Sequence, residues 1–316
     1  MSRFCLKVYY DNPVQLINNC LLDYLTKLKL AEPNIRVLLD RRREENESIK
    51  LIIKDAKSKN VNSLKDHIQN YMSNYPIPLE EITLPIDDWF LPFPQNSIEE
   101  IEDYSWDISQ IGGLQASEVS FDFLTKQTDI YLSLIEREKI TFDSSIKISL
   151  YMHTIFCASF EISPMEQNEF YIWMTQNCLD SFIYLEGVED LELTKKTAKE
   201  NSFKIAETHV EDYEPLFLYI FEAIHEGDDF DEDWINNFIL NCQETYQKIV
   251  QLQEEGVYIE HNQFRYNENL GTPKQNQKRW SLYKYYINII FSHLGIDLYS
   301  KVTILAIMTG LANKRK

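Results

Sequence analysis

The hydrophobic pattern of the chain changes at Gly112-Gly113, and this change constrains the fold more than any other feature. Before the pair, short β-branched and aromatic runs alternate with helical stretches, whereas after it apolar residues recur at helical spacing almost to the end. The 316 residues include only 8 glycines and 10 prolines, so the regular elements should be long. We therefore predict an α+β protein with a sheet region over 1–110 and a mostly α-helical region over 111–316.

The N-terminal region predicts the element order β-α-β-β-α-β. The strands are expected over 4–10, 35–39, 48–54 and 79–86, and the helices over 11–30 and 62–71. The turn Asp11-Asn12-Pro13 places a capping residue and a proline where the first helix should begin. This order is typical of the split-βαβ or ferredoxin-like fold, in which an antiparallel sheet carries both helices on one face.

The C-terminal region predicts helices that are separated by glycine and proline. They are expected over 115–138, 142–161, 163–184, 189–208, 210–226, 231–255, 275–294 and 298–314. No internal repeat relates these segments, so we do not expect a repeat architecture.

The chain is acidic, with 50 Asp and Glu against 31 Lys and Arg and a net charge of -19. Because neutralising phosphates needs a surplus of basic side chains, we expect neither nucleic acid nor a membrane as a partner. The charge is uneven. Residues 180–235 hold seventeen acidic side chains against four lysines, whereas 274–316 hold eight basic side chains against one aspartate. The basic C-terminal helices are either a solubilising surface or a seat for an acidic peptide.

The five cysteines are widely scattered and form no CxxC pair, which favours buried free thiols in a reducing cytoplasm over disulfides or a zinc site. The start of the chain lacks a signal-peptide pattern. No run of 18 apolar residues that would span a membrane occurs. We therefore expect a cytoplasmic protein.

Motifs for common chemistry are absent: the chain contains no GxGxxG, GxxxxGK[ST], HExxH or GxSxG. The acidic run Glu226–Asp233 lacks the spacing of an EF-hand loop and favours a solvated helix N-terminus. His153 and Cys157 lie one helical turn apart, but the neighbouring Phe156 and Phe160 favour a core histidine and an inert thiol over a catalytic pair. We therefore expect no metal and no cofactor.

Three segments resemble one family. Trp106–Gly113 is similar to the E-x-x-R-Y-G-G segment of the C-terminal domain of lantibiotic dehydratases, also called the thiopeptide-type bacteriocin biosynthesis domain. Val37–Arg41 with Ser48–Lys54 resembles its strand pair W-F-x-x-R-Y … H-L-R-L-R-F, and Tyr286–Ile296 resembles its closing helix H-M-x-x-N-R-L-G-I. The matches occur in the family's order and cover nearly the whole chain.

The departures from the family pattern are informative. In the family's elimination domains, arginines, a carboxylate and a histidine bind a glutamylated Ser or Thr and expel glutamate. Here the strand arginines are replaced by Lys50 and Ile52, the Glu and Arg of the Gly-Gly segment by Asp107 and Gln110, and the histidine by Asn288. A carboxylate prefers bidentate guanidinium partners, and the missing imidazole removes the general base. The resemblance therefore does not support glutamate elimination.

The stand-alone pyridine synthases of thiopeptide biosynthesis form the branch of this family that lacks these groups. They join two dehydroalanines of a modified precursor peptide by a formal aza-[4+2] cycloaddition, and then lose water and the leader peptide to form a central pyridine. The resemblance thus implies a thiocillin-type macrocyclase that needs no cofactor. Its expected partners are a modified precursor peptide with an acidic leader and other biosynthetic enzymes of the same pathway.

Neutral donors and acceptors suit this reaction better than charged anion binders. In the expected helix 275–294, a polar stripe at i, i+4, i+7 and i+11 consists of Ser281, Tyr285, Asn288 and Ser292. Under the resemblance, Tyr285 would donate or accept a proton, Asn288 and Gln110 would orient amides, and Ser281 or Ser292 would assist. Lys50 and Asp107 are candidate substrate-binding residues, or would instead contact the groups named above without touching the substrate. A stripe that merely faces solvent is the alternative interpretation.

By family analogy the sheet region would hold the leader peptide. Its candidate contacts are Arg36, Arg41, Arg42 and Arg43, although a solubilising loop explains these arginines equally well. Two rival functions stay open. One is the glutamate-elimination subunit of a split lantibiotic-type dehydratase, and the other is a non-catalytic protein that binds the leader peptide.

Overall fold

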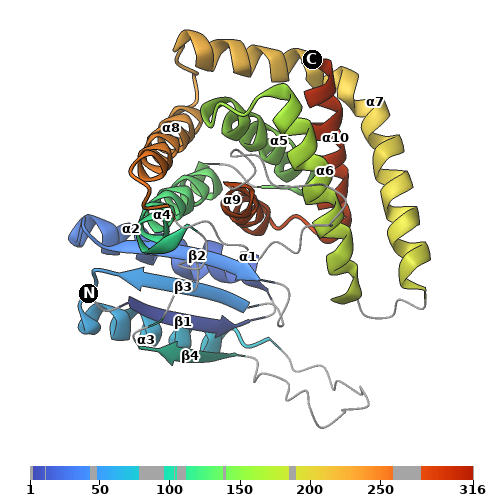
Figure 1. The fold of residues 1–316 in the computed structure, drawn as a ribbon. Helices are drawn as coiled ribbons and strands as arrows, with labels where there is room; N and C mark the ends of the chain where they lie inside the picture. The colour runs from blue at the N-terminus through green and yellow to red at the C-terminus, as the bar shows by residue number, and fades with distance from the viewer. Residues whose placement is uncertain are drawn as a thin grey trace. The chain divides into compact units, whose positions relative to one another are not determined.

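A computed structural model of the chain describes residues 3–10, 12–42, 48–77, 96–102, 104, 112–137, 140–184, 190–258 and 279–315. The chain divides into two compact units (Figure 1). The sheet unit comprises Met1–Trp106 and Tyr131–Lys139, and the helical unit comprises Asp107–Ile130 and Ile140–Lys316. The predicted α+β class is confirmed.

Within the described residues, the sheet unit contains a four-stranded antiparallel sheet in the order β2-β3-β1-β4. Its strands are β1 (Arg3–Tyr9), β2 (Arg36–Arg42), β3 (Ser48–Lys54) and β4 (Ser97–Ile101). The helical segments are α1 (Pro13–Leu16), the π-helical turn η1 (Ile17–Leu21), α2 (Leu22–Ala31) and α3 (Ser58–Asn74). The order of the elements along the chain and the order of the strands in the sheet are both those of the ferredoxin-like fold, as predicted. The strand expected over 79–86 lies outside the described residues, and the sequence pattern does not predict β4.

The two faces of the sheet differ in polarity, because successive strand residues point to opposite faces. One face carries the buried side chains of Phe4, Leu6, Val8, Val37, Leu39, Ile49, Leu51 and Ile53. An ion pair of 2.6 Å joins Lys65 of α3 to Glu100, which is paired with Leu6 in the register, so α3 covers this apolar face. The rings of Tyr24 and His67 stack 4.6 Å apart and place α2 beside α3. Both helices therefore lie on one face, as the fold predicts.

The helical unit agrees closely with the predicted helices. It consists of the first part of α4 (Gly113–Arg137) and of α5 (Phe142–Ser159), α6 (Pro164–Asp180), the 3₁₀ turn η3 (Ser181–Tyr184), α7 (Leu191–Glu226), α8 (Asp233–Glu254), α9 (Trp280–Leu294) and α10 (Leu298–Lys314). α10 packs against α6 and α7 (Figure 1). Two helices begin or end at the residues that the sequence indicates. Ser163 caps α6 with Pro164 in its first turn, and Gly295 ends α9 in the left-handed conformation.

One prediction differs from the structure. The two helices expected over 189–208 and 210–226 form the single helix α7, which contains Pro215. Proline removes one backbone donor and crowds the preceding turn, so it bends a helix that tertiary packing keeps continuous. In Figure 1 the yellow and golden parts of α7 accordingly run in different directions.

Aromatic side chains form the core of the helical unit around α9. The ring centroids of Phe123 and Tyr286 are 4.4 Å apart, those of Phe156 and Phe160 are 4.2 Å apart, and Tyr283 packs edge-on against Phe160. All five side chains are buried. Offset and edge-on aromatic pairs stabilise a core beyond the burial of their area, so this cluster anchors α9 inside the unit.

The cysteines are free thiols, as predicted, and Cys5, Cys20, Cys157 and Cys242 are buried. Among the described residues, no helix is both long enough and apolar enough to cross a bilayer.

Candidate functional site

The polar stripe of α9 occupies one face of an otherwise buried helix. Ser281, Tyr285, Asn288 and Ser292 are all half-buried, and only Lys284 among the remaining residues of α9 is not buried. The face is therefore neither ordinary core nor fully exposed surface. It offers hydroxyl, phenol and amide groups in a row along about three turns of helix.

Polar contacts hold α9 beside its neighbours, among them one to α6 and one to α8. Lys284 Nζ donates to Asn177 Oδ1 at 2.8 Å and lies over the ring of Trp173, which connects α9 to α6. At the start of the helix, Arg279 Nε donates to Gln253 Oε1 of α8 at 2.7 Å. The stripe is thus presented by a helix that is anchored at its beginning and in its middle.

Helix α4 begins at Gly113, directly after Gly112, and both glycines adopt positive φ angles, of 87° and 85° respectively. A Cβ atom at Gly112 would lie 2.7 Å from Ala116 Cβ and 2.8 Å from Tyr258 Cε2. The pair is therefore required by backbone conformation and by close packing of Tyr258 at the start of α4. Asp107 and Gln110, which precede it, lie outside the described residues.

Gly112→Ala should destabilise the protein by about 3 kcal/mol, because a left-handed alanine and an overpacked contact add their costs. Gly227→Ala is the matched control. Gly227 has a similar φ of 80°, but nothing lies within 4 Å of a Cβ at that position, so the loss should be only about 1 kcal/mol. Urea unfolding followed by tryptophan fluorescence measures both values. Equal losses would show that the neighbours of Gly112 relax without cost.

The second face of the sheet is polar and carries Lys50. The register aligns Asp40, Lys50, Lys7 and Glu99 in one row across the strands β2, β3, β1 and β4. Lys50 is 7% exposed and Asp40 is 3% exposed, so the ammonium and the carboxylate are buried beside each other. Lys7 Nζ lies 3.3 Å from Glu99 Oε2. Burial raises the pKa of Cys5 in the adjoining row to about 11, and Lys50 and Lys7 oppose that shift.

A further row of this face consists of Arg36, Lys54 and Arg3. Arg36 binds Asp55 through two nitrogens, with Nη2 at 2.6 Å and Nε at 3.0 Å from Oδ2. This guanidinium therefore already has a carboxylate partner within its own unit. Together the rows make the polar face basic, with more ammonium and guanidinium groups than carboxylates among its described side chains.

The structure separates the candidate leader contacts. Arg41 lies in the row of Ile49 and Val8, which is the apolar face of the sheet, whereas Arg36 lies on the polar face. Burial raises the pKa of Tyr131 to about 12, and the Arg41 guanidinium near it acts in the opposite direction. The backbone of Arg42 belongs to β2, but its side chain is outside the described residues, as is the whole of Arg43.

His153 and Cys157 belong to the core, as the sequence indicates. Cys157 Sγ lies 3.2 Å from the hydroxyl of Tyr171, which lies 3.3 Å from His153 Nδ1, and all three side chains are fully buried. Burial lowers the pKa of His153 to about 3 and raises that of Cys157 to about 12. Both groups are therefore neutral at pH 7, and no thiolate–imidazolium pair forms.

The described residues contain no group of three or more His, Cys, Asp or Glu side chains that could hold a metal ion. This includes the acidic run Glu226–Asp233, whose last residue begins α8. The interpretation of this run as a solvated helix N-terminus agrees with that position.

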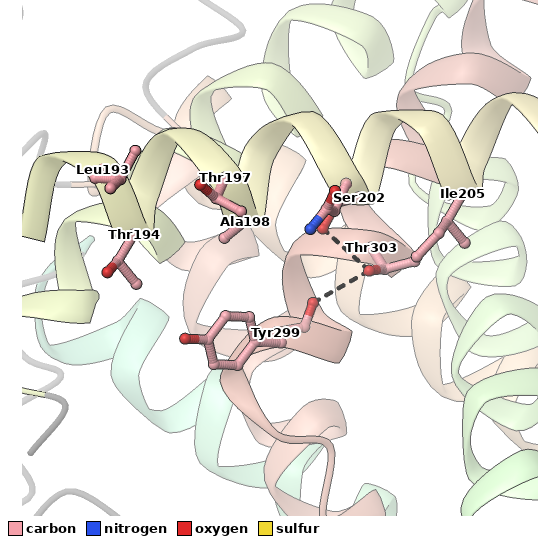
Figure 2. A pocket seen from close by; sticks show the side chains of 9 residues that line it. Leu193, Thr194, Thr197, Ala198, Ser202, Ile205, Tyr299 and Thr303 are labelled. Carbon is pink, nitrogen blue, oxygen red and sulfur yellow. Dashed lines mark hydrogen bonds between the residues drawn. The ribbon is translucent and has the colours of Figure 1, made fainter. Parts of the chain in front are cut away.

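Sequence reasoning missed a groove of about 390 Å³ between α7 and α10 (Figure 2). It is lined by Leu193, Thr194, Thr197, Ala198, Asn201, Ser202, Ile205, Tyr299 and Thr303. The hydroxyl groups of Ser202 and Thr303, which both line it, lie 3.1 Å apart. Small residues at i, i+4 and i+8 of α7 were the signal for this close approach. The lining holds no carboxylate, imidazole, thiol or ammonium group, so the groove offers no acid–base pair.

No family model and no curated protein sequence matches the chain. Several solved structures match it, and three of them are described here. The pyridine synthase TbtD from thiomuracin biosynthesis has a TM-score of 0.65 at 11% identity, covering 99% of this chain and 98% of TbtD. TsrL has a TM-score of 0.65 at 11% identity, covering 100% of this chain and 95% of TsrL. The tRNA-dependent lantibiotic dehydratase MibB from Microbispora sp. 107891 has a TM-score of 0.53 at 10% identity, covering 99% of this chain and 28% of MibB.

These matches span both units of the chain, and at such low identities they show a shared fold. The shared fold covers nearly the whole of TbtD and TsrL and 28% of MibB.

Proposed function

We propose that this chain is a thiopeptide pyridine synthase. It would join two dehydroalanines of a modified precursor peptide by a formal aza-[4+2] cycloaddition, and then expel water and the leader peptide to form the central pyridine of a macrocycle. The observation that carries the proposal is the nearly complete mutual coverage with TbtD, 99% of this chain and 98% of that one.

The α9 stripe supports the proposal chemically. Two uncharged alkenes must be brought together, and holding them in a reactive geometry can supply about 7–11 kcal/mol of the barrier. An amide must also shift toward its imidic tautomer, which needs a donor and an acceptor that are both neutral at pH 7. A phenol at Tyr285 and an amide at Asn288 on one half-buried face meet this need. Ser281 and Ser292 extend the row by one turn at each end.

The sheet unit is proposed to hold the acidic leader. On its polar face Lys50 and Lys54 are buried, but Arg3, Lys7 and Arg36 are partly exposed and suit the carboxylates of such a peptide. Because Arg36 and Arg41 lie on opposite faces, a leader bound to one face would contact only one of them. Their roles can therefore be separated by single substitutions.

The fold shared with a part of MibB favours one alternative, glutamate elimination by a split dehydratase. Against it stands the charge pattern of the candidate residues. Lys50 provides one ammonium where the family has arginines, and Asn288 stands where the family has a histidine.

A single incubation tests the proposal against this alternative. The protein is mixed with a leader-bearing linear peptide that contains thiazoles and two dehydroalanines, and the products are followed by mass spectrometry. We expect a pyridine macrocycle and the leader released as a C-terminal amide. Recovery of starting peptide alone, under conditions in which a known synthase converts it, contradicts the proposal. Loss of glutamate from a glutamylated peptide would establish the alternative.

A further inference from the structure

The hydroxyl of Tyr286 makes a buried polar contact between α9 and α4. Tyr286 and Ser120 are both 0% exposed, and their hydroxyl oxygens lie 2.7 Å apart. Ser120 Oγ also donates to the carbonyl oxygen of Ala116 at 2.6 Å. Since the Ser120 proton is used in that bond, the Tyr286 hydroxyl is the donor and Ser120 Oγ the acceptor.

This contact leads to the Gly-Gly pair at the start of α4. Ala116 is the residue whose Cβ would meet a Cβ at Gly112, at 2.7 Å. Ala116 and Ser120 are four residues apart and share one face of α4, and Gly112 lies against Ala116 just before the helix. Tyr286 therefore ties α9 to the face of α4 that begins at Gly112.

The hydrogen bond between Tyr286 and Ser120 matters more for the orientation of α9 than for the stability of the core. The other contacts of Tyr286 are with the rings of Phe123, Phe156 and Phe160, and apolar burial has no preferred direction. A hydrogen bond does have one. Successive helical residues are about 100° apart around the axis, so the Tyr286–Ser120 bond contributes, beside the bonds of Lys284 and Arg279, to where Tyr285 and Asn288 point.

We propose that Tyr286 is a positioning residue, whose buried hydroxyl sets the rotation of α9 and thereby the direction of Tyr285 and Asn288. This inference rests on the proposed function, because it concerns the same stripe. Small displacements of reacting groups reduce turnover far more than they reduce binding or folding.

The test compares Tyr286→Phe with Tyr283→Phe, a matched change on the same helix. Both tyrosines are buried in the same aromatic core, but the hydroxyl of Tyr283 lies beside Arg279 of its own segment. With the linear dehydroalanine peptide as substrate, Y286F should lower kcat about tenfold and leave KM within about twofold. Y283F should leave both constants within about twofold. Equal kcat values for the two variants would overturn the proposal.

A second measurement separates this inference from the proposed function. Amide hydrogen exchange, followed by mass spectrometry over 280–294, reports the hold on α9 whatever the substrate is. Y286F should accelerate exchange in this segment at least about threefold more than Y283F does. If the wild-type protein does not convert the peptide, the proposed function fails while this readout still judges Tyr286. Equal exchange in the two variants would overturn the positioning role.

Discussion

Replacing Tyr285 by phenylalanine and Asn288 by alanine together should lower kcat for pyridine formation roughly 1,000-fold, within the range observed for the loss of general acid–base groups. Both side chains are half-buried on the polar face of α9, so their removal opens no core cavity and the fold should persist. Single-turnover kinetics of the linear dehydroalanine peptide measure the effect. KM should change little if the two groups act mainly in the transition state.

The groove between α7 and α10 provides the matched control. Tyr299 is 48% exposed and Asn201 is also exposed, so Tyr299→Phe with Asn201→Ala makes the same chemical changes outside the α9 stripe. This variant should retain wild-type kcat. A Tyr285→Phe/Asn288→Ala protein that turns over at the wild-type rate would remove the stripe from the mechanism. If the double substitution leaves turnover unchanged and the protein binds the leader peptide tightly, a non-catalytic leader-binding protein would be favoured.

The sheet illustrates what sequence can predict. Strand β3 occupies 48–54 as expected, because a β-branched run is flanked in the sequence by charged residues on both sides. The polar face of the sheet was harder to recognise from the sequence. Both faces of β3 are buried, so Ile49 to Ile53 reads as one nearly continuous apolar run in which only Lys50 is charged. The register with β2 and β1 then shows Asp40 and Lys7 beside it.

The sequence of β2 predicts on which faces Arg36 and Arg41 lie, but it does not predict their partners. Arg36 and Arg41 are five positions apart in one strand, and an odd separation puts two side chains on opposite faces. The partner of Arg36, by contrast, is Asp55 after the following strand. Such pairing follows from the hairpin register, which the sequence of β2 alone does not contain.

The candidate site divides in the same way. The stripe on α9 could be predicted, since i, i+4, i+7 and i+11 share a helical face wherever the helix packs. The contact that holds this helix against α4 could not be predicted. Ser120 and Tyr286 are separated by 166 positions, and neither has a local signal that names the other. Contacts of this kind depend on how helices pack, which is set by the sum of many weak apolar contacts.

Lowering the pH from 7 to 4.5 should destabilise the protein by about 3 kcal/mol through His153 alone. Burial lowers its pKa from about 6.5 in the unfolded chain to about 3 in the folded protein. The folded state thus holds the neutral imidazole, while the unfolded state gains a proton below pH 6.5. Stability is therefore intact above pH 6.5 and falls by about 1.4 kcal/mol per pH unit until the folded pKa is reached.

His153→Gln tests this expectation, because glutamine cannot gain the proton. The variant loses the contact with Tyr171 at every pH, which costs about 1 kcal/mol, but its loss of stability between pH 7 and 4.5 should be about 3 kcal/mol smaller than that of the wild type. Carboxylates begin to gain protons near pH 4.5 in both proteins alike, so the difference between the two profiles isolates His153. His225→Gln, a change at an exposed histidine, should leave the pH dependence as it is. Parallel urea-unfolding profiles for wild type and His153→Gln would mean that the imidazole takes up a proton from water admitted to the folded core.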